Sequence, residues 1–162
     1  MLRISKMTDY GTLILAELAN GAAEPRSATD IAASTGLGAP TASKLLKSLA
    51  RAGLVTSQRG SRGGYVLAKP ADAITAVAII DAIEGPVALT ACASNDTQCE
   101  LEHVCGVGSS WQQISASIRA GLAAISLDDM RRNRNLPAEM PLRPMYGAAN
   151  TESRAHLLPR DQ

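Results

Sequence analysis

Residues 27–68 restrict the fold of this chain most, because they combine two short helices, a glycine turn between them and a hairpin after them. Ser27 is an N-cap candidate with an acidic residue three positions on, and a helix is predicted over residues 29–35. The turn Gly-Leu-Gly follows, and Pro40 stands where the first residue of a helix is favoured. A second helix is therefore expected over residues 40–52.

The second of these helices has one apolar face and one polar, basic face. Its apolar residues at helical spacing are Ala42, Leu45, Leu46 and Leu49. The rest of its surface is left to Thr41, Ser43, Lys44, Lys47, Ser48 and Arg51. Two short helices joined by a glycine turn, the second with a basic face, are typical of a helix-turn-helix motif.

A basic hairpin is predicted directly after the motif. Residues 54–57 and 65–68 have the composition of short strands, and the seven residues between them include three glycines together with Arg59 and Arg62. Glycine permits close approach of the backbone, and arginine suits phosphates or a narrow minor groove. A solvated turn is the alternative for the hairpin alone. Its position after the two helices favours a winged helix-turn-helix, a mainly α fold with a small β wing, bound to double-stranded DNA.

The charge of the chain is distributed unevenly. Residues 1–69 hold nine Lys or Arg and four Asp or Glu, and residues 70–162 hold seven and eleven. The first part is thus the candidate for a polyanionic partner. An ordinary solvated surface is the alternative explanation of this excess.

The composition excludes several classes of protein. With no Phe, one Trp and three Tyr among 162 residues, the core must be aliphatic. No apolar run approaches the roughly 20 residues that span a bilayer, and the N-terminus lacks the apolar region of a signal peptide. The protein is therefore expected to be cytoplasmic, with no membrane partner. No Walker loop, dinucleotide fingerprint, nucleophile elbow or HExxH motif is present, so neither an enzyme nor a small-molecule substrate is expected.

All three cysteines of the chain fall within fourteen residues, at Cys92, Cys99 and Cys105. Glycines and a proline on both sides of this stretch predict a loop, which can turn its thiolates toward one point. Thiolates are soft, anionic ligands that suit an iron–sulfur cluster, zinc or copper(I). Three of them leave a set of four ligands one short.

Other roles for the cysteines are weaker. A disulfide with one free thiol is possible, but disulfides are rare in cytosolic proteins. Buried structural thiols fit poorly, because the stretch between them is rich in Asn, Asp, Gln and Glu. Zinc is a weaker interpretation than an iron–sulfur cluster, because the spacing contains no C-x-x-C pair.

Three further helices are predicted outside the motif, from about Ser5 or Thr8 to Ala19, over residues 73–83 and over residues 109–127. The apolar face of the first comprises Tyr10, Leu13, Ile14 and Leu18. The last carries a three-four repeat of Trp111, Ile114, Ile118, Leu122 and Ile125. Such a repeat resembles a coiled-coil seam and indicates a homodimer, with packing onto its own domain as the alternative.

Four segments are therefore expected. Residues 1–84 form the DNA-binding domain, residues 85–108 the cysteine-containing loop, and residues 109–130 the dimerisation helix. Residues 131–162 are rich in Pro and charged residues without a periodic apolar face, so they are expected to be mostly disordered.

The opening Met1 to Gly11, the winged domain with Arg59 to Tyr65, and the three cysteines at these spacings together resemble the iron–sulfur transcription regulators typified by IscR and NsrR. The resemblance covers about residues 1–130, and the opening is most similar to the branch that regulates the SUF iron–sulfur assembly operon. It implies a homodimer with crossed long helices and one cluster per subunit, [2Fe-2S] more often than [4Fe-4S].

The resemblance also implies a ligand set. The three family cysteines correspond to Cys92, Cys99 and Cys105. The histidine that some members use after the third cysteine is missing from residues 106–110. Other members take an acidic residue near the N-terminus from the partner subunit, and Asp9 stands at that position; its alternative role is to favour the start of the first helix.

These features predict a repressor of SUF-type genes that senses cluster status. Nitric oxide or redox sensing through the same cluster is the first alternative, and a zinc-bound structural or redox protein is a weaker one. In this prediction, phosphates are contacted by Lys44, Lys47 and Arg51, base edges by Thr41 and Ser43, and the minor groove by Arg59 and Arg62.

Overall fold

The structure, a computed structural model, describes residues 4–21, 24–60, 63–87, 89–90 and 107–132. In chain order its elements are the helices α1 (Lys6–Asn20), α2 (Ala28–Thr35) and α3 (Ala39–Arg51), the strands β1 (Val55–Gln58) and β2 (Gly64–Leu67), the 3-10 helix η1 (Ala71–Ala73), and the helices α4 (Ala76–Glu84), α5 (Gly108–Ala123) and α6 (Leu127–Arg131).

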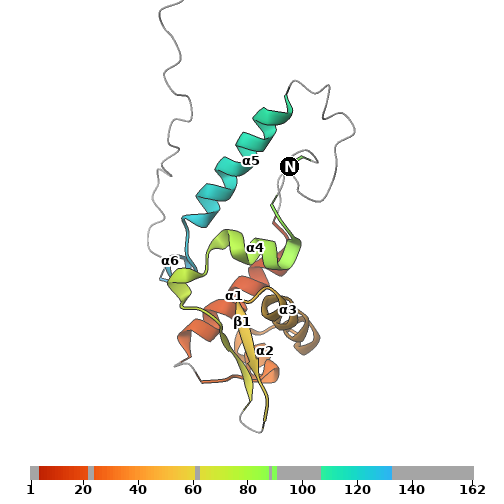
Figure 1. The fold of residues 1–162 in the computed structure, drawn as a ribbon. Coiled ribbons are helices and arrows are strands. Elements are labelled where there is room, and N and C mark those ends of the chain that lie inside the picture. The colour runs from red at the N-terminus through yellow and green to blue at the C-terminus, as the bar shows by residue number, and fades with distance from the viewer. Residues whose placement is uncertain (1–3, 22–23, 61–62, 88, 91–106, 133–162) are drawn as a thin grey trace, which may run out of the picture.

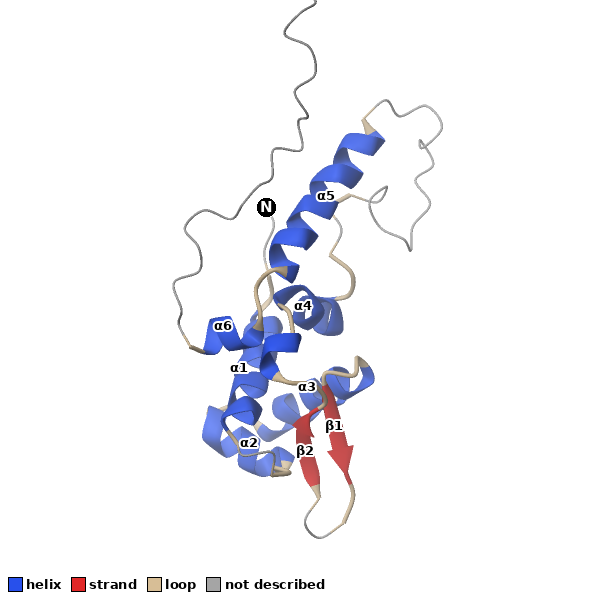
Figure 2. Cartoon of the chain, turned by 60° about the vertical axis from the view of Figure 1, so that its left-hand side comes forward, coloured by secondary structure: helices blue, strands red, loops and turns tan. Residues whose placement is uncertain are grey.

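The helices α1 to α4 and the two-stranded hairpin pack together, and α5 projects away from them (Figure 1). Figure 2 shows the hairpin beside α3, with its tip beyond the helices. The mainly helical fold with a small β wing is therefore confirmed. None of the helices described is long and apolar enough to cross a membrane.

One aliphatic core unites these elements, as the lack of Phe requires. Its buried residues come from every helix of the body except η1: Ile14, Leu15, Leu18, Ile31, Ala32, Ala42, Leu45, Leu46, Leu49, Leu54, Val55, Ile74, Ile79 and Leu127. The predicted apolar face of α3 is buried in full. In α1, Leu13 is 45% exposed and Leu15 is buried instead, so the predicted face of α1 was partly wrong.

The ends of the helix-turn-helix follow local sequence rules. The Ser27 hydroxyl accepts a hydrogen bond from the Asp30 amide at 3.1 Å and so caps α2. Gly36 ends α2 with φ at +71°, a conformation in which other residues are strained. α3 then begins at Ala39, one residue before the predicted start at Pro40.

The hairpin is antiparallel, with Val55 paired to Leu67 and Gln58 to Gly64. A distant residue lengthens this sheet, because Arg26 forms an isolated bridge with Tyr65 through two backbone hydrogen bonds of 3.1 and 2.8 Å. The segment before α2 therefore holds the wing against the body, a contact that local sequence patterns do not reveal.

Two helix boundaries in the second half were predicted wrongly, for one physical reason. The Ile125 carbonyl accepts the Ala76 amide at 2.8 Å, and the Ile74 carbonyl accepts the Leu127 amide at 2.7 Å. This pairing keeps residues 74–75 extended, so α4 begins at Ala76 and not at residue 73. It also ends the long helix, predicted over residues 109–127, at Ala123.

The short helix α6 lies in a part of the chain predicted to belong to the long helix and the tail. A capping box between Ser126 and Asp129 starts it, and Leu127 is fully buried in the core. Arg131 donates to Asn20 at 2.8 Å and pairs with Asp128 at 3.0 Å, which fastens α6 to the end of α1. The predicted tail therefore begins after α6, and residues 133–162 lie outside the described part of the chain.

Candidate nucleic-acid interface and metal-binding segment

The solvent-facing side of α3 carries five of the residues predicted to contact DNA. Lys44, Lys47 and Arg51 are exposed, and Thr41 and Ser43 are half-buried near the start of the helix. The salt bridges between described residues involve none of these three cations. The core on the opposite side of α3 fixes the direction in which its basic face points.

The tip of the hairpin requires glycine at two positions. Gly60 has φ at +115°, and the Gly63 amide donates to the Gly60 carbonyl at 2.9 Å. A Cβ atom on Gly63 would lie 2.4 Å from the Gln58 carbonyl oxygen. The backbone folds back tightly here and leaves Arg59 exposed. The other predicted wing residue, Arg62, lies outside the described residues.

Strand β1 presents further polar groups that the sequence analysis missed. Val55 is buried, whereas the next three residues Thr56, Ser57 and Gln58 are all exposed. A half-buried strand should alternate, so the run of three polar residues was the available signal that the strand leaves the body.

The three cysteines lie outside the described residues, but both ends of the segment that carries them are described. The Asp81 carboxylate accepts the Val87 amide at 3.1 Å, and the Ser115 hydroxyl accepts the Leu89 amide at 3.4 Å. On the other side, Val107 leads directly into α5. Within the described residues no group of three or more His, Cys, Asp or Glu could hold a metal ion.

A bidentate ion pair joins α4 to α5 at this place. Arg119 donates to the two oxygens of Asp81 at 2.9 and 2.7 Å. The hydrogen bonds from Arg119 lower the pKa of the Asp81 carboxyl, with a smaller contribution from the Val87 amide. Such parallel hydrogen bonds fix the orientation of both side chains as well as their distance.

A second carboxylate, three residues further along α4, reaches the start of α1. Glu84 accepts the Ser5 amide at 2.9 Å and also the Thr8 hydroxyl. The hydrogen bond from Thr8 is the main reason why the pKa of Glu84 is lowered. Sequence reasoning missed both carboxylates. Their position in the last turn, where the helix dipole disfavours negative charge, was the signal that they need partners.

Asp9, the predicted fourth ligand, is an exposed residue of α1 on the rim of an apolar cavity of about 340 Å³. The cavity lies where α1, α4 and the end of α5 meet. The residues that line it are Ile4, Thr8, Asp9, Thr12, Ala76, Ile79, Ile80, Leu122, Ile125 and Met130. Asp9 is the one carboxylate among them, and Thr8 beside it belongs to the Glu84 contact.

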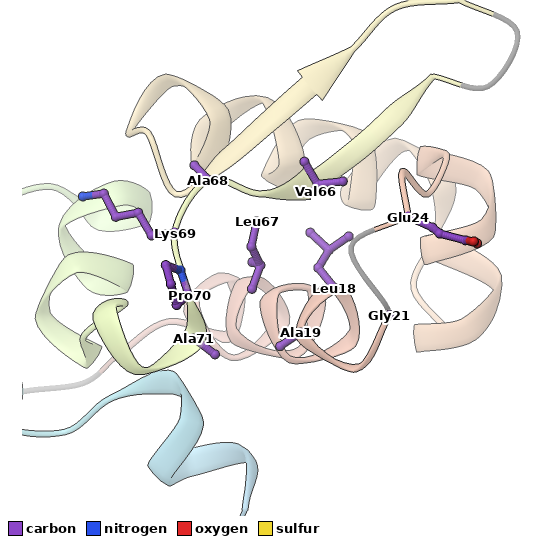
Figure 3. A pocket seen from close by; sticks show the side chains of 10 residues that line it. All are labelled: Leu18, Ala19, Gly21, Glu24, Val66, Leu67, Ala68, Lys69, Pro70 and Ala71. Carbon is purple, nitrogen blue, oxygen red and sulfur yellow. The ribbon is translucent and has the colours of Figure 1, made fainter.

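A second cavity, of about 430 Å³, lies between the end of α1 and the chain that follows β2 (Figure 3). Leu18 and Leu67 face it, and the charged ends of Glu24 and Lys69 turn away from it. It contains none of the predicted site residues, so the candidate functions do not involve it.

Comparison with known proteins adds to this geometry. A family model described as Rrf2, iron-dependent transcriptional regulator, matches residues 4–133. The chain belongs to the Rrf2 family. Over 130 residues it is 34% identical to the HTH-type transcriptional regulator CymR of Bacillus subtilis, covering 80% of this chain and 89% of that protein.

Two solved structures of Rrf2-type regulators have the same fold. The B. subtilis CymR structure, described as the global cysteine regulator, matches with a TM-score of 0.62 at 33% identity, covering 82% of this chain and 98% of that chain. The structure of T. potens IscR matches with a TM-score of 0.58 at 32% identity, covering 82% of this chain and 88% of that chain. The chain is therefore a DNA-binding transcriptional regulator of the winged helix-turn-helix type, as predicted, and such regulators are not enzymes. Family membership alone does not specify the signal, because CymR and IscR are both members.

Proposed function

We propose that this Rrf2-family chain is a repressor of SUF-type iron–sulfur assembly genes and holds an iron–sulfur cluster on Cys92, Cys99 and Cys105. The main supporting observation is that the segment carrying these cysteines leaves α4 through fixed contacts to Asp81 and Ser115 and leads back into α5. The thiolates are thus attached to α4, which packs against α3, and to α5, which packs against α4.

The donor set fits such a cluster. Three thiolates from one short polar segment match the preference of iron–sulfur clusters for cysteine. The resemblance to the IscR and NsrR regulators implies [2Fe-2S] more often than [4Fe-4S]. The cluster supplies a group whose presence depends on iron and oxidants. Nitric oxide or redox state is the alternative signal for the same site.

DNA contact is assigned to the exposed faces of α3 and the wing. Lys44, Lys47 and Arg51 neutralise phosphates, whereas Thr41 and Ser43 at the start of α3 approach base edges. Arg59 and Arg62 place the wing at the minor groove. Loss of operator affinity in both Arg59→Ala and Arg62→Ala is expected, and unchanged affinity in both variants would remove the wing from this proposal.

The functional unit is proposed to be a homodimer. Because α5 projects from the body, its apolar side chains Trp111 and Ile114 remain 41% and 43% exposed. Ile4, which is 48% exposed, lines the apolar cavity beside Asp9. A second copy of the chain could bury the exposed apolar side chains of α5 and cover the cavity that Ile4 lines.

In such a dimer, Asp9 is proposed as the fourth ligand to the partner's cluster. It lies in the first turn of α1 and lines the apolar cavity that the second copy is proposed to cover. A carboxylate binds iron less firmly than thiolate or imidazole, which suits a sensor that must lose its cluster. Asp9→Ala is expected to fold and dimerise, to show an altered visible spectrum, and to lose iron faster in air. A spectrum and lifetime equal to the wild type would direct attention to Glu102 or His103.

Anaerobic purification with a visible spectrum and an iron and sulfide assay tests the cluster directly. Cys92→Ala, Cys99→Ala and Cys105→Ala should each lose iron and sulfide while the helix content stays unchanged, and Gln113→Ala, at an exposed position of α5, serves as the control. Full iron and sulfide content in all three cysteine variants would refute the assignment. A colourless protein replete with zinc would favour a structural metal instead.

A second candidate is favoured by the likeness to CymR, which is described as a cysteine regulator. In that case the chain would regulate cysteine-related genes without a cluster. The same iron and sulfide assay separates the two candidates. The target genes are tested by comparing the affinity of the protein for DNA upstream of SUF-type genes with its affinity for DNA upstream of cysteine-related genes.

A further inference from the structure

The last turn of α4 carries Asp81 and Glu84 at a place where a helix disfavours negative charge. Side chains three residues apart lie on one face of a helix, so both carboxylates lie on the same face at the end of α4. Their partners belong to three different parts of the chain. This arrangement needs an explanation beyond the stability of α4 itself.

Asp81 joins the segment leading to the cysteines with the long helix. One carboxylate oxygen of Asp81 accepts two hydrogen bonds, one from the Val87 amide at 3.1 Å and one from the Arg119 guanidinium at 2.9 Å. The other oxygen accepts a second hydrogen bond from Arg119 at 2.7 Å. The pair is partly shielded, with side chains 30% and 38% exposed. A shift of Val87 therefore changes the hydrogen bonding of the ion pair.

Ser115 makes the companion contact one turn before Arg119 on α5. Its side chain is buried, and its hydroxyl accepts the Leu89 amide. Because Ser115 and Arg119 are four residues apart, they share one helix face. Leu89 meets this face at Ser115, and Val87 meets Asp81, the partner of Arg119. Val87 is thus fixed to Asp81 of α4 and Leu89 to Ser115 of α5, shortly before Cys92.

Glu84 continues the connection to the DNA-binding body. It holds the start of α1 through the Ser5 amide and the Thr8 hydroxyl. α4 also packs on α3 and α1, with Ile79 fully within the core that buries Leu45 and Leu49 of α3. A displacement at the end of α4 is therefore passed to α3 by close-packed side chains.

We propose that Asp81 and its partner Arg119 are positioning residues that couple the state of the cysteine-containing segment to the DNA affinity of α3. This inference rests on the proposed function, since it assumes that the segment is the sensing part. It assigns the coupling to an ion pair outside the ligand set and outside the DNA-contacting face. Breaking the pair separates the two processes without removing either a thiolate or a base contact.

The test is a cycle of four full-length proteins: wild type, Cys92→Ala, Asp81→Asn, and the double variant. The probe is the duplex that the wild type binds most tightly among fragments upstream of its own gene and of SUF-type genes. In the wild-type background Cys92→Ala should change the dissociation constant at least fivefold. In the Asp81→Asn background the same substitution should change it less than twofold. Arg119→Gln should reproduce Asp81→Asn.

Two measurements distinguish coupling from a structural role. The Val87 amide should exchange hydrogen at least tenfold faster in Asp81→Asn and Arg119→Gln, while iron content and dimerisation stay at wild-type values. Asp128→Asn, which breaks ion pairs on α6, is the matched control and should leave the effect of Cys92→Ala intact. Arg119→Lys keeps the charge without the two parallel hydrogen bonds, and its coupling should be intermediate.

The outcomes separate this inference from the proposed function. An equal effect of Cys92→Ala in both backgrounds, or none in either, overturns the coupling role of Asp81. A wild type that lacks iron and sulfide overturns the cluster assignment, and the cycle still decides the coupling. A wild type that binds none of the duplexes overturns both.

Discussion

At the scale of single residues, the position of the wing depends on a glycine whose backbone lies too close to another segment to leave room for a side chain. Gly64 opens β2 beside the extended residue Arg26. A Cβ atom on Gly64 would lie 2.6 Å from the Arg26 carbonyl carbon and oxygen. Both neighbours are backbone atoms and cannot rotate away, in contrast to Gly11, where the nearest atom is the side-chain Cδ1 of Ile83.

Gly64→Ala should therefore lower the free energy of unfolding by about 1–3 kcal/mol, the usual cost of forcing extra atoms into a packed site. Gly21→Ala is the control, because a Cβ atom there meets nothing closer than 3.6 Å and φ is negative. Urea unfolding followed by circular dichroism measures both variants. Equal stability of Gly64→Ala and the wild type would show that the bridge between Arg26 and Tyr65 can shift at no cost.

At the scale of elements, α3 and α5 are both amphipathic but use their apolar faces differently. The apolar face of α3 is buried within the chain, so its basic face is directed outward. Near the start of α5, Trp111 and Ile114 are 41% and 43% exposed, because this helix projects from the body. The first arrangement predicts an electrostatic contact and the second an apolar one.

Lys47→Gln should weaken binding to all DNA duplexes by a similar factor and reduce the slope of log K against log salt by about 1, as expected for the loss of one phosphate contact. Lys69→Gln removes a lysine that is also exposed and that follows the end of β2, at the end of the hairpin opposite its tip. This control should leave the slope unchanged. Fluorescence anisotropy titrations over a range of salt measure both, and equal slopes for the two variants would contradict the assignment.

Trp111→Ala should weaken the dimer by about 2 kcal/mol or more, since exposed tryptophans that become buried dominate interfaces. Gln113→Ala, at an exposed position on another side of the same helix, should have little effect. Sedimentation at several protein concentrations gives the dissociation constants. A wild type that stays monomeric, or a Trp111→Ala dimer as tight as the wild type, would argue against a dimer built on α5.

At the scale of the whole molecule, carboxylates hold segments together that are distant in sequence. Glu17 pairs with Arg26, Asp81 with Arg119, and Glu84 with the start of α1. The hydrogen bonds lower the pKa of all three carboxyls, led by those from Arg26, Arg119 and Thr8. Each is ionised in the folded chain to a lower pH than in the unfolded chain.

Such groups contribute stability that is complete above their unfolded pKa values, near 4, and is lost as the pH falls through their folded pKa values. The metal-free protein should therefore be about equally stable at pH 7 and pH 5 and should lose stability below about pH 4. The double variant Asp81→Asn, Glu84→Gln should have a lower free energy of unfolding than the wild type at pH 7. Its free energy of unfolding should also fall less than that of the wild type on acidification. Urea unfolding from pH 7 to pH 3 measures this, and parallel curves would show that neither carboxyl is linked to folding.

Local rules in the sequence determined the helix-turn-helix, the wing and the broad function. Ser27 as a cap, Gly36 in a left-handed conformation and the apolar face of α3 each act within a few residues of the chain, so a local pattern suffices to predict them. The ligand set on the three cysteines remains a prediction, and family membership supports the regulatory function.

Tertiary structure alone decided where α4 begins, where α5 ends and what the carboxylates of α4 contact. Residues 74–76 pair with residues 125–127, which are about fifty positions away, and this pairing overrides the helical periodicity of both segments. Asp81 meets Arg119 across 38 positions, and Ser5 meets Glu84 across 79. No local pattern contains such contacts, because hydrogen bonds between distant segments form only once the core has brought those segments together.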